Sequence, residues 1–542
     1  MAASATHQVP TGEDDPCVSW GSAEFVAAEE MGRSRGFWWS PDGRRLAVAR
    51  ADTSPVDTWW VANAANPGEA PVALRYPAAG TPNADVTLHV LDPAGRAAAR
   101  EVVWDRAAFP YLAAVDWSAR RPLTLTVQSR DQRRLLVLEA DPVGGGTTER
   151  WRQEDARWVE LTPGAPRWWG DRLVVLVDRD GARRVVVDGE PLTPPTLQVR
   201  GIVGELEGDL VIAASEDPTE THLHRLAPGG ELHRLTASSG VHGGAVGGDV
   251  LVTASTSMAW GGTRHMVWRR GEAVGEIGSL AARPGLAPRG RFWVLGERRL
   301  QAVVLAPRPG VKVPEGPLPV LVDPYGGPHA QRVVRARNAH LTSQWFADQG
   351  FVVVVVDGRG TPARGPDWER AVWGDLAAPV LDDQVDALLA LAEHDERLDL
   401  SRVGIRGWSF GGYLAALAVL RRPDVFHAAV AGAPVTDWRL YDTHYTERYL
   451  GDPAEQPDHY ERTSLLTDAE RLTRPLLLIH GLADDNVVSA HTFQLSSALL
   501  AHGRPHQVLP LSGVTHMTPQ EVVAENLLRL QVDFLRGALG ST

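Results

Sequence analysis

The chain has 542 residues, with 54 Lys and Arg against 67 Asp and Glu, for a net charge of −13. This length supports two or three domains, and the acidic balance without a Lys/Arg block argues against a nucleic-acid partner. The single cysteine, Cys17, excludes an internal disulfide, and no apolar run reaches the ~18–20 residues of a membrane span. Because residues 1–16 are polar and acidic, without a basic and apolar signal segment, we expect a cytoplasmic protein with no membrane association.

From about residue 37 to 280, short apolar or alternating runs are interrupted by Gly, Pro, Asp and Asn. Examples are WWSPDGRRLAVARAD (38–52), PRWWGDRLVVLVDRDGARRVVVDG (166–189) and GGAVGGDVLVTASTS (243–257). This pattern predicts an all-β domain built from hairpins. The runs recur loosely at about 40–50 residues, which is the size of one propeller blade, so we expect a propeller-like domain rather than the plainer β-sandwich.

After about residue 285, strand patterns alternate with helix patterns. Residues 318–327 and 351–360 read as buried strands, whereas 382–394, 491–503 and 521–535 read as helices. Alternation of this kind predicts a doubly wound, mostly parallel sheet. We therefore expect an α/β-hydrolase domain over 285–542, preceded by the propeller-like domain over 1–284.

One serine lies in a G-x-S-x-G pattern, formed by Gly407, Ser409 and Gly411. The pattern alone is common in a glycine-rich chain, but here it follows a β-rich run and precedes a helical pattern. That context is the nucleophile elbow, in which a serine is held at a tight turn between a strand and a helix. Ser409 is therefore the candidate nucleophile.

Partners for this serine follow in the order expected on the fold, which is Ser, then an acid, then His. Asp484 and Asp485 come directly after a predicted strand, and spacing alone does not separate them. His516 follows the next predicted strand and is the candidate base. Covalent chemistry on serine requires no cofactor, and the histidines of HTFQLSSALLAH and THYTERY lack carboxylate or cysteine partners at metal-ligand spacing, so we expect neither a cofactor nor a metal.

Several longer stretches resemble the prolyl oligopeptidase superfamily, in its dipeptidyl peptidase IV branch. They are DPYGGP (323–328), DGRGT (357–361), GWSFGGYL (407–414), APVTDWRLYDTHYTERYLG (433–451) and HGLADDNV (480–487). The N-terminal half adds EFVAAEEMGRSRGFWWSPDG (24–43) and LRYPAAGTPNADV (74–86), which resemble bacterial members of this branch. The resemblance implies a serine exopeptidase that releases Xaa-Pro or Xaa-Ala dipeptides from peptides with a free N-terminus. A hydrolase of the same chemistry, such as an acylaminoacyl peptidase or an esterase, is the alternative, and an inactive propeller-containing binding protein is a third.

The resemblance also implies roles for individual residues. It selects Asp484 as the acid of the triad, and it makes the hydroxyl of Tyr325 and the backbone N–H of Phe410 the oxyanion hole. Glu29 and Glu30 correspond to the glutamates that bind the substrate's ammonium group. Asn486 corresponds to an asparagine that contacts the substrate carbonyl. The pocket for the residue before the cleaved bond is formed by Phe410, Val435, Trp438, Tyr441, Tyr445 and Val487.

The chain departs from this family's pattern at its beginning. In the family the paired glutamates follow several blades, whereas here they occur at positions 29 and 30. The early blades, and the arginine they contribute to the substrate carbonyl, are thus not represented, and the remaining length predicts five or six blades. Members of the family are often homodimers through the hydrolase domain, so we also expect a homodimer.

Overall fold

The computed structural model describes residues 13–94, 98–117 and 121–540. The chain divides into two compact units. The first consists of residues 1–60, 73–175 and 441–456, and the second of residues 61–72, 176–440 and 457–542. Each unit is therefore made of three separate stretches of the chain, and the expected boundary between residues 284 and 285 stays a prediction.

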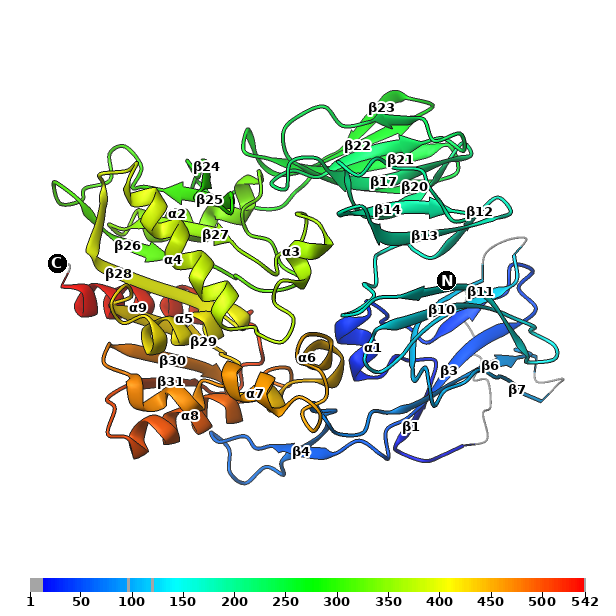
Figure 1. Cartoon of the computed structure of the whole chain (residues 1–542), viewed down its shortest axis with the longest axis horizontal. Coiled ribbons are helices and arrows are strands. Elements are labelled where there is room, and N and C mark those ends of the chain that lie inside the picture. Colours follow the sequence, from blue (N-terminus) through cyan, green and yellow to red (C-terminus); the bar gives the residue numbers. More distant parts are fainter. Residues whose placement is uncertain (1–12, 95–97, 118–120, 541–542) are drawn as a thin grey trace. The chain divides into compact units, whose positions relative to one another are not determined.

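Two antiparallel sheets form most of the first unit (Figure 1). One has the order β1-β3-β6-β7, with β2 also paired to β3: β1 Val18–Trp20, β2 Phe37–Trp39, β3 Leu46–Asp52, β6 Asp85–Leu91 and β7 Arg100–Val102. The other has the order β11-β10-β9-β8: β8 Tyr111–Asp116, β9 Leu123–Gln128, β10 Arg134–Ala140 and β11 Thr147–Glu154. Apolar side chains from both sheets, among them Trp38, Leu88, Leu125 and Leu138, form one buried core. This core holds the two sheets face to face.

Two helices belong to the same unit, although they are far apart in the sequence. Helix α1 (Phe25–Glu30) begins where the Glu24 side chain accepts hydrogen bonds from the N–H groups of Val26 and Ala27. Helix α6 (Thr443–Leu450) begins at Asp442, whose side chain accepts a hydrogen bond of 3.0 Å from the N–H of Tyr445. Both are side-chain N-caps, which stabilise the first turn of a helix. The two helices pack against each other, so the acidic end of α1 lies against α6.

Three more antiparallel sheets lie in the stretch from β12 to β23, with strands hydrogen-bonded in chain order. Their strands are β12 Arg167–Trp169, β13 Arg172–Arg179, β14 Ala182–Val187 and β15 Glu190–Pro191; β16 Gln198–Leu206, β17 Asp209–Ser215, β18 His222–Leu226 and β19 Leu232–Arg234; and β20 Val241–Gly247, β21 Val250–Ser257, β22 Trp260–Arg269 and β23 Glu272–Ile277. A separate two-stranded sheet joins β4 (Thr58–Val61) to β5 (Val72–Arg75). Counting β1–β3, β6 and β7 as the first, the described residues form five blade-sized sheets, within the predicted five or six.

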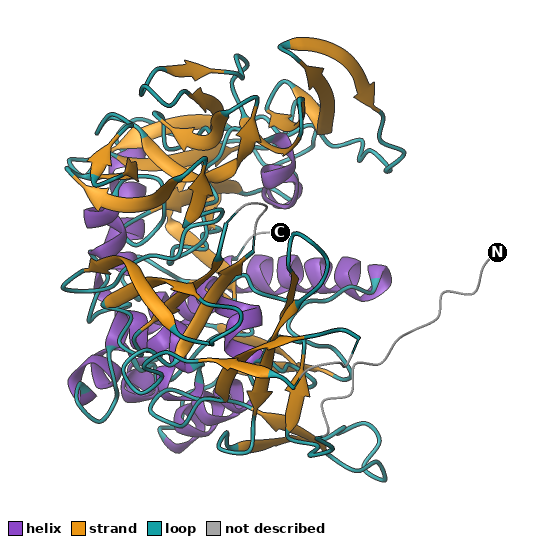
Figure 2. Ribbon diagram, turned by 90° about the vertical axis from the view of Figure 1, so that its right-hand side faces the viewer, coloured by secondary structure: helices purple, strands orange, loops and turns teal. Residues whose placement is uncertain are grey.

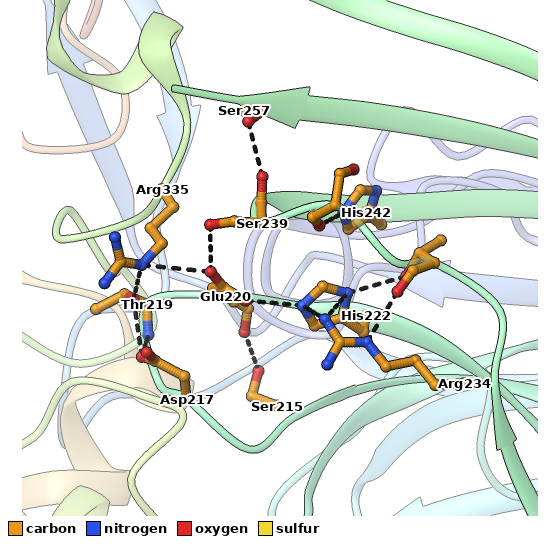
Figure 3. Close-up of polar contacts among 12 residues, drawn as sticks. Ser215, Asp217, Thr219, Glu220, His222, Arg234, Ser239, His242, Ser257 and Arg335 are labelled. Atoms are coloured by element: carbon orange, nitrogen blue, oxygen red, sulfur yellow. Dashed lines mark hydrogen bonds and ion pairs between the residues drawn. The ribbon is translucent and has the colours of Figure 1, made fainter. Parts of the chain in front are cut away.

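A polar cluster connects the last two of these sheets to the segment before helix η1 (Arg337–His340) in the second unit (Figure 3). The Nε2 atom of His222 lies 2.9 Å from the carboxylate of Glu220, and the guanidinium of Arg234 contacts the His222 ring. The rings of His222 and His242 lie 5.1 Å apart between centroids. Arg335 is 3.3 Å from Glu220, and its N–H donates to the carbonyl of Thr219 over 2.9 Å. Each charge therefore has a partner of opposite charge or a polar neighbour, as buried polar groups require.

An eight-stranded sheet forms the rest of the second unit, in the order β24-β25-β27-β26-β28-β29-β30-β31. Its strands are β24 Arg291–Leu295, β25 Leu300–Leu305, β26 Leu318–Val322, β27 Val352–Asp357, β28 Leu398–Trp408, β29 Ala428–Gly432, β30 Leu476–Gly481 and β31 Gln507–Leu511. Strands β24 and β25 are antiparallel to their neighbours, and the other pairs are parallel. This topology confirms the predicted mostly parallel sheet.

Helices cover both faces of this sheet, and Figure 2 shows how they gather around it. Helices α2 (Leu341–Ala347) and α9 (Glu521–Leu539) share one core with Val353 and Val355 of β27. Because side chains alternate along a strand, the neighbouring valines of β27 point to the other face, where α4 (Ala378–Ala392) and α5 (Phe410–Arg421) pack. The remaining helices are α3 Pro366–Arg370, α7 Pro457–Thr463, α8 Ala490–Ala501, η1 Arg337–His340, η2 Trp438–Leu440 and η3 Leu466–Arg471. In the described part of the chain, no helix is both long and apolar enough to cross a membrane.

The strand order of the eight-stranded sheet indicates where on this sheet a ligand-binding site is expected. The chain passes from β26 to β27 on one side and then returns to β28 on the other, so β26 and β28 are adjacent parallel strands at the point where the order reverses. In open α/β sheets, ligands bind outside the carboxyl ends of the strands at such a point. Tyr325 follows β26, Ser409 follows β28, Asp484 follows β30 and His516 follows β31.

Candidate active site

Ser409 lies in a strained turn between β28 and α5. Its backbone has φ 58° and ψ −119°, in a region that residues other than glycine rarely adopt. The flanking glycines make this turn possible, because a Cβ on Gly407 would lie 2.1 Å from the Gly411 carbonyl oxygen and one on Gly411 would lie 2.8 Å from the Pro324 carbonyl oxygen. The end of β28 and the start of α5 are therefore too close together for a side chain at Gly407. The serine is thus held at the helix N-terminus, the geometry that the sequence pattern predicts.

The acid and the histidine form a direct hydrogen-bonded pair. His516 Nδ1 lies 2.8 Å from Asp484 Oδ2, and the Asp484 side chain is fully buried. The other oxygen of Asp484 accepts hydrogen bonds from the N–H groups of Asn486, at 3.0 Å, and Val487, at 2.9 Å. Of the two candidate acids, Asp484 contacts His516, whereas Asp485 is exposed to solvent.

Burial alone would raise the pKa of Asp484, but hydrogen bonds from His480 and His516 outweigh it and lower that pKa below its ordinary value. The acid is therefore ionised at neutral pH. A carboxylate bonded to Nδ1 fixes the tautomer of a histidine and leaves Nε2 free to accept a proton. This is the state that a general base requires.

Two contacts hold the histidine and the acid in place. The indole N–H of Trp408, the residue before the nucleophile, donates to the carbonyl of His516 over 2.8 Å. His480 Nε2 lies 2.7 Å from the Val487 carbonyl and 3.6 Å from Asp484 Oδ2, while its Nδ1 lies 2.7 Å from the Thr492 hydroxyl. The first contact connects the histidine loop to the elbow, and the second set fixes the loop of the acid. Neither His480 nor Trp408 was predicted from the sequence to act at the site, although both occur inside the motifs quoted above.

Tyr325 lies against the elbow. Its ring centroid is 5.8 Å from that of Phe410, and the segment before it is anchored by Asp323. Asp323 is buried and accepts from Arg332 at 3.1 Å and from Arg406 at 2.7 Å. Burial would raise the pKa of Asp323, but these two guanidinium groups lower it, so the anchor stays charged. The structure therefore brings Tyr325 to the N-terminus of α5, where the backbone N–H groups of the first turn lack partners within the helix.

The residues predicted to form the apolar pocket are divided between the two units. Phe410, Val435, Trp438 and Val487 are buried in the second unit, with ring centroids of Phe410 and Trp438 5.7 Å apart. Asn486 lies in the same unit, in the Asp484 loop. Tyr441 and Tyr445 belong to the first unit, where their rings meet edge to face at 5.3 Å.

The two predicted glutamates end α1 in the first unit. Glu29 is exposed, and Glu30 is half-buried and hydrogen-bonded to Asp442, the N-cap residue of α6. Burial, and then the charge of Asp442, raise the pKa of Glu30 well above its usual value. Burial likewise raises the pKa of Asp442 to about 7. Burial, and then the proximity of like charges, thus both favour the protonated forms of these two carboxyl groups.

Behind this acidic pair lies a buried cation that the sequence analysis missed. Arg448 on α6 is 3.0 Å from Glu160 and donates to the side-chain oxygen of Gln132 over 2.6 Å. Glu447 on the same helix pairs with Arg130 at 2.7 Å. The quoted motif YDTHYTERYLG contains Asp442, Glu447 and Arg448, but nothing local in it indicates contacts with residues so far away in the sequence.

The eight-stranded sheet has the α/β-hydrolase fold, and it carries an elbow serine and a buried acid–histidine pair beside a set of blade-sized β-sheets. Comparison with known proteins narrows the class. Residues 338–542 match the model of the prolyl oligopeptidase family, and residues 1–259 match the model of the dipeptidyl peptidase IV N-terminal region. The chain therefore belongs to the prolyl oligopeptidase family, in its dipeptidyl peptidase IV branch.

Individual relatives agree with this assignment. The chain is 43% identical to human dipeptidyl peptidase 8 over 198 residues, which are 35% of this chain and 22% of that protein. It is 27% identical to a probable dipeptidyl-aminopeptidase B of Coccidioides posadasii (strain C735) over 536 residues, which are 89% of this chain and 58% of the relative. The chain thus spans less than two thirds of the length of these relatives. The crystal structure of Porphyromonas gingivalis dipeptidyl peptidase 4 has the same fold, with a TM-score of 0.87, 24% identity, and coverage of 96% of this chain and 77% of that one.

Proposed function

We propose that the protein is a serine exopeptidase that releases Xaa-Pro or Xaa-Ala dipeptides from the N-terminus of peptides, through an acyl-enzyme on Ser409. The observation that carries the proposal is the 2.8 Å hydrogen bond between His516 Nδ1 and buried Asp484, joined through Trp408 to a serine in a strained elbow. The names of the relatives, which are dipeptidyl peptidases and dipeptidyl-aminopeptidases, support the choice of substrate.

In this proposal the Ser409 hydroxyl attacks the carbonyl carbon of the second residue while His516 Nε2 accepts the hydroxyl proton. The hydroxyl of Tyr325 and the N–H of Phe410 donate to the oxyanion that develops. When the C–N bond breaks, His516 returns the proton to the leaving amine. Water then attacks the acyl-enzyme by the same route and releases the dipeptide.

Two groups of residues would select the substrate. Phe410, Val435, Trp438, Tyr441, Tyr445 and Val487 supply apolar walls that suit the rigid ring of proline. Glu29 and Glu30 bind the free ammonium, which fixes the register so that cleavage follows the second residue. Asn486 donates to a substrate carbonyl. The half-buried position of Glu30 supports this role in its ionised form, because a partly desolvated carboxylate binds an ammonium more strongly than a fully hydrated one.

The test compares a glycyl-proline chromogenic amide with the same compound carrying a blocked amino group. The proposal predicts cleavage of the free-amine compound alone, and loss of that cleavage in Ser409→Ala. Glu30→Gln should raise KM by about tenfold or more, whereas the exposed control Glu272→Gln on β23 should leave KM unchanged. Equal cleavage of both compounds would instead show a working triad that does not select the free amine, which would contradict the proposed anchor and favour the alternative, an acylaminoacyl peptidase or an esterase.

The homodimer and the cytoplasmic location are further parts of the proposal. A groove of 560 Å³ beside the edge strand β31, lined by Leu509, Leu530 and Phe534 among others, supports self-association through the hydrolase part, since open sheet edges and apolar grooves favour pairing. Light scattering after gel filtration tests the dimer. Leu530, which is 49% exposed, is the residue to replace by arginine, and a dimer that survives Leu530→Arg would contradict this interface. Cell fractionation tests the location.

A further inference from the structure

One buried histidine of the second unit, His480, is not used in the reaction steps proposed above. It is the next-to-last residue of β30, and its side chain is 1% exposed. Both ring nitrogens have hydrogen-bond partners: Nε2 lies 2.7 Å from the carbonyl oxygen of Val487, and Nδ1 lies 2.7 Å from the hydroxyl of Thr492 on α8. Two such contacts fix the orientation of the imidazole ring.

The partners of the ring determine where its hydrogen lies. A carbonyl oxygen only accepts hydrogen bonds, so Nε2 carries a hydrogen and donates it to Val487. A hydroxyl both donates and accepts, so the neutral ring accepts the hydrogen of Thr492 on Nδ1. Nε2 also lies 3.6 Å from Oδ2 of Asp484. The N–H edge of His480 therefore faces both a backbone carbonyl and the carboxylate of the proposed triad.

The backbone of Val487 connects the histidine to the acid a second time. Its N–H donates to Oδ1 of Asp484 over 2.9 Å, while its carbonyl accepts from His480 over 2.7 Å. The polar contacts thus close a ring from His480 to Val487, from Val487 to Asp484 and from Asp484 back to His480. The N–H of Asn486 donates to the same oxygen of Asp484 over 3.0 Å. The acid and the two residues 486 and 487 are therefore held by one network that is attached to β30.

We propose that His480 is a positioning residue for the reaction, because it holds Asp484 and the Val487 side of the substrate pocket in a fixed relation to each other. The inference rests on the proposed function, which assigns Asp484 to the triad and Val487 to the pocket. Without the contact between His480 and Val487, the loop after β30 is free to shift, and a misplacement of about 1 Å costs about 10²-fold in rate. Because such a shift moves the acid and the pocket wall together, kcat should fall and KM should rise.

Two substitutions separate the two sides of the His480 ring. The amide nitrogen of glutamine stands as far along the side chain as Nε2 of histidine, and the amide nitrogen of asparagine stands as far along as Nδ1. His480→Gln therefore keeps a donor for Val487 and loses the contact with Thr492, whereas His480→Asn keeps a polar group beside Thr492 and loses the contact with Val487. A role in filling the core alone predicts no advantage of glutamine over asparagine in the pocket and the acid.

The experiment measures kcat and KM of the full chain for the glycyl-proline chromogenic amide. His480→Gln should keep kcat/KM within about tenfold of the unaltered chain, whereas His480→Asn should lower it about 10²-fold through both constants. Partial unfolding alone lowers kcat and leaves KM unchanged, so the rise in KM is the diagnostic result. If KM stays constant, or if the two variants behave alike, the inference is wrong and the proposed function stands. If the unaltered chain does not cleave the amide, both are wrong.

His502→Asn is the matched control, because it makes the same chemical change at an exposed histidine directly after α8, and it should alter neither constant. Thermal unfolding of each variant shows whether it folds. If His480→Asn does not fold, nitrogen NMR of the unaltered chain with labelled histidines provides the test, the signal of His480 being the one that His480→Gln removes. A hydrogen on Nε2 supports the inference. A ring whose only hydrogen is on Nδ1 cannot donate to Val487 and would overturn it.

Discussion

Replacement of Asp484 by asparagine removes one charge and preserves nearly the whole shape of the site. The asparagine has one side-chain oxygen, and the N–H groups of Asn486 and Val487 already donate to that position at 3.0 and 2.9 Å. Its NH2 group is then directed at His516 Nδ1, where a carboxylate oxygen accepted before, at 2.8 Å. Two donors cannot share that contact, so the imidazole must carry its proton on Nε2 instead.

A histidine protonated on Nε2 is unable to accept the proton of Ser409. The variant also loses the negative charge that stabilises the imidazolium ion. When a triad loses both the correct histidine tautomer and this negative charge, kcat falls about 10⁴-fold, which corresponds to about 5.5 kcal/mol in the activation barrier. Steady-state hydrolysis of the glycyl-proline amide measures this directly, and we expect KM to change much less than kcat, because the substituted group contacts no substrate.

Asp485→Asn is the matched control, since it makes the same chemical change one residue further on at an exposed position. It should retain the activity of the parent chain. Thermal unfolding of both variants separates loss of catalysis from loss of fold. If Asp484→Asn keeps kcat within about tenfold of the parent, or if Asp485→Asn is the more damaging change, the assignment of the acid is refuted.

The other predictions concern the amine anchor and the elbow. Because the pKa of Glu30 is raised and that of Asp442 is about 7, a rise in pH through this value removes protons and adds negative charge to the anchor, so KM for a free-amine substrate should fall. The measurement runs up to about pH 7, because the substrate's own amine, with an ordinary pKa of about 7.7–8.0, keeps its proton there, and a KM that rises with pH in this range would contradict the prediction. Gly407→Ala places a Cβ 2.1 Å from the carbonyl oxygen of Gly411, so it should lower the free energy of unfolding by about 2–3 kcal/mol in urea titrations and abolish hydrolysis. Gly275→Ala, where a Cβ has no atom within 4 Å, is the control expected to change neither.

Much of the fold could be predicted from the sequence because its signals are local. The alternation of strands and helices after residue 285 corresponds to the eight-stranded sheet, and the predicted helix 521–535 corresponds to α9, which extends to Leu539. The elbow is partly a local signal, because Gly407 is required by its contact with the Gly411 backbone, whereas Gly411 is required by the carbonyl oxygen of Pro324, which is distant in the sequence. The helix predicted over 382–394 starts a few residues too late, because α4 begins at Ala378. The side chain of Asp375 accepts hydrogen bonds from the N–H groups of Ala377 and Ala378 at this start.

Contacts between distant segments could not be predicted in this way. Spacing alone left Asp484 and Asp485 equivalent, because the path of the loop after β30 decides which carboxylate faces His516. The hydrogen bond between Glu30 and Asp442 depends on the packing of α1 against α6. The resemblance assigned Trp438, Tyr441 and Tyr445 to one pocket, but it did not show that they lie in different elements. The chain leaves η2 after Leu440 and begins a separate helix at Thr443, with Tyr441 between them.

The position of α6 has a consequence for the synthesis of the chain. Arg448 is buried against Gln132, Glu447 pairs with Arg130, and the ring of His444 lies 4.9 Å from that of Tyr111. The ribosome makes Tyr111, Arg130 and Gln132 long before it makes α6. Until then, the two sheets of the first unit have polar and aromatic groups without their native partners. The first unit is therefore not a stretch of sequence that can be cut out, and a fragment that stops at Val175 would lack the helix that completes it.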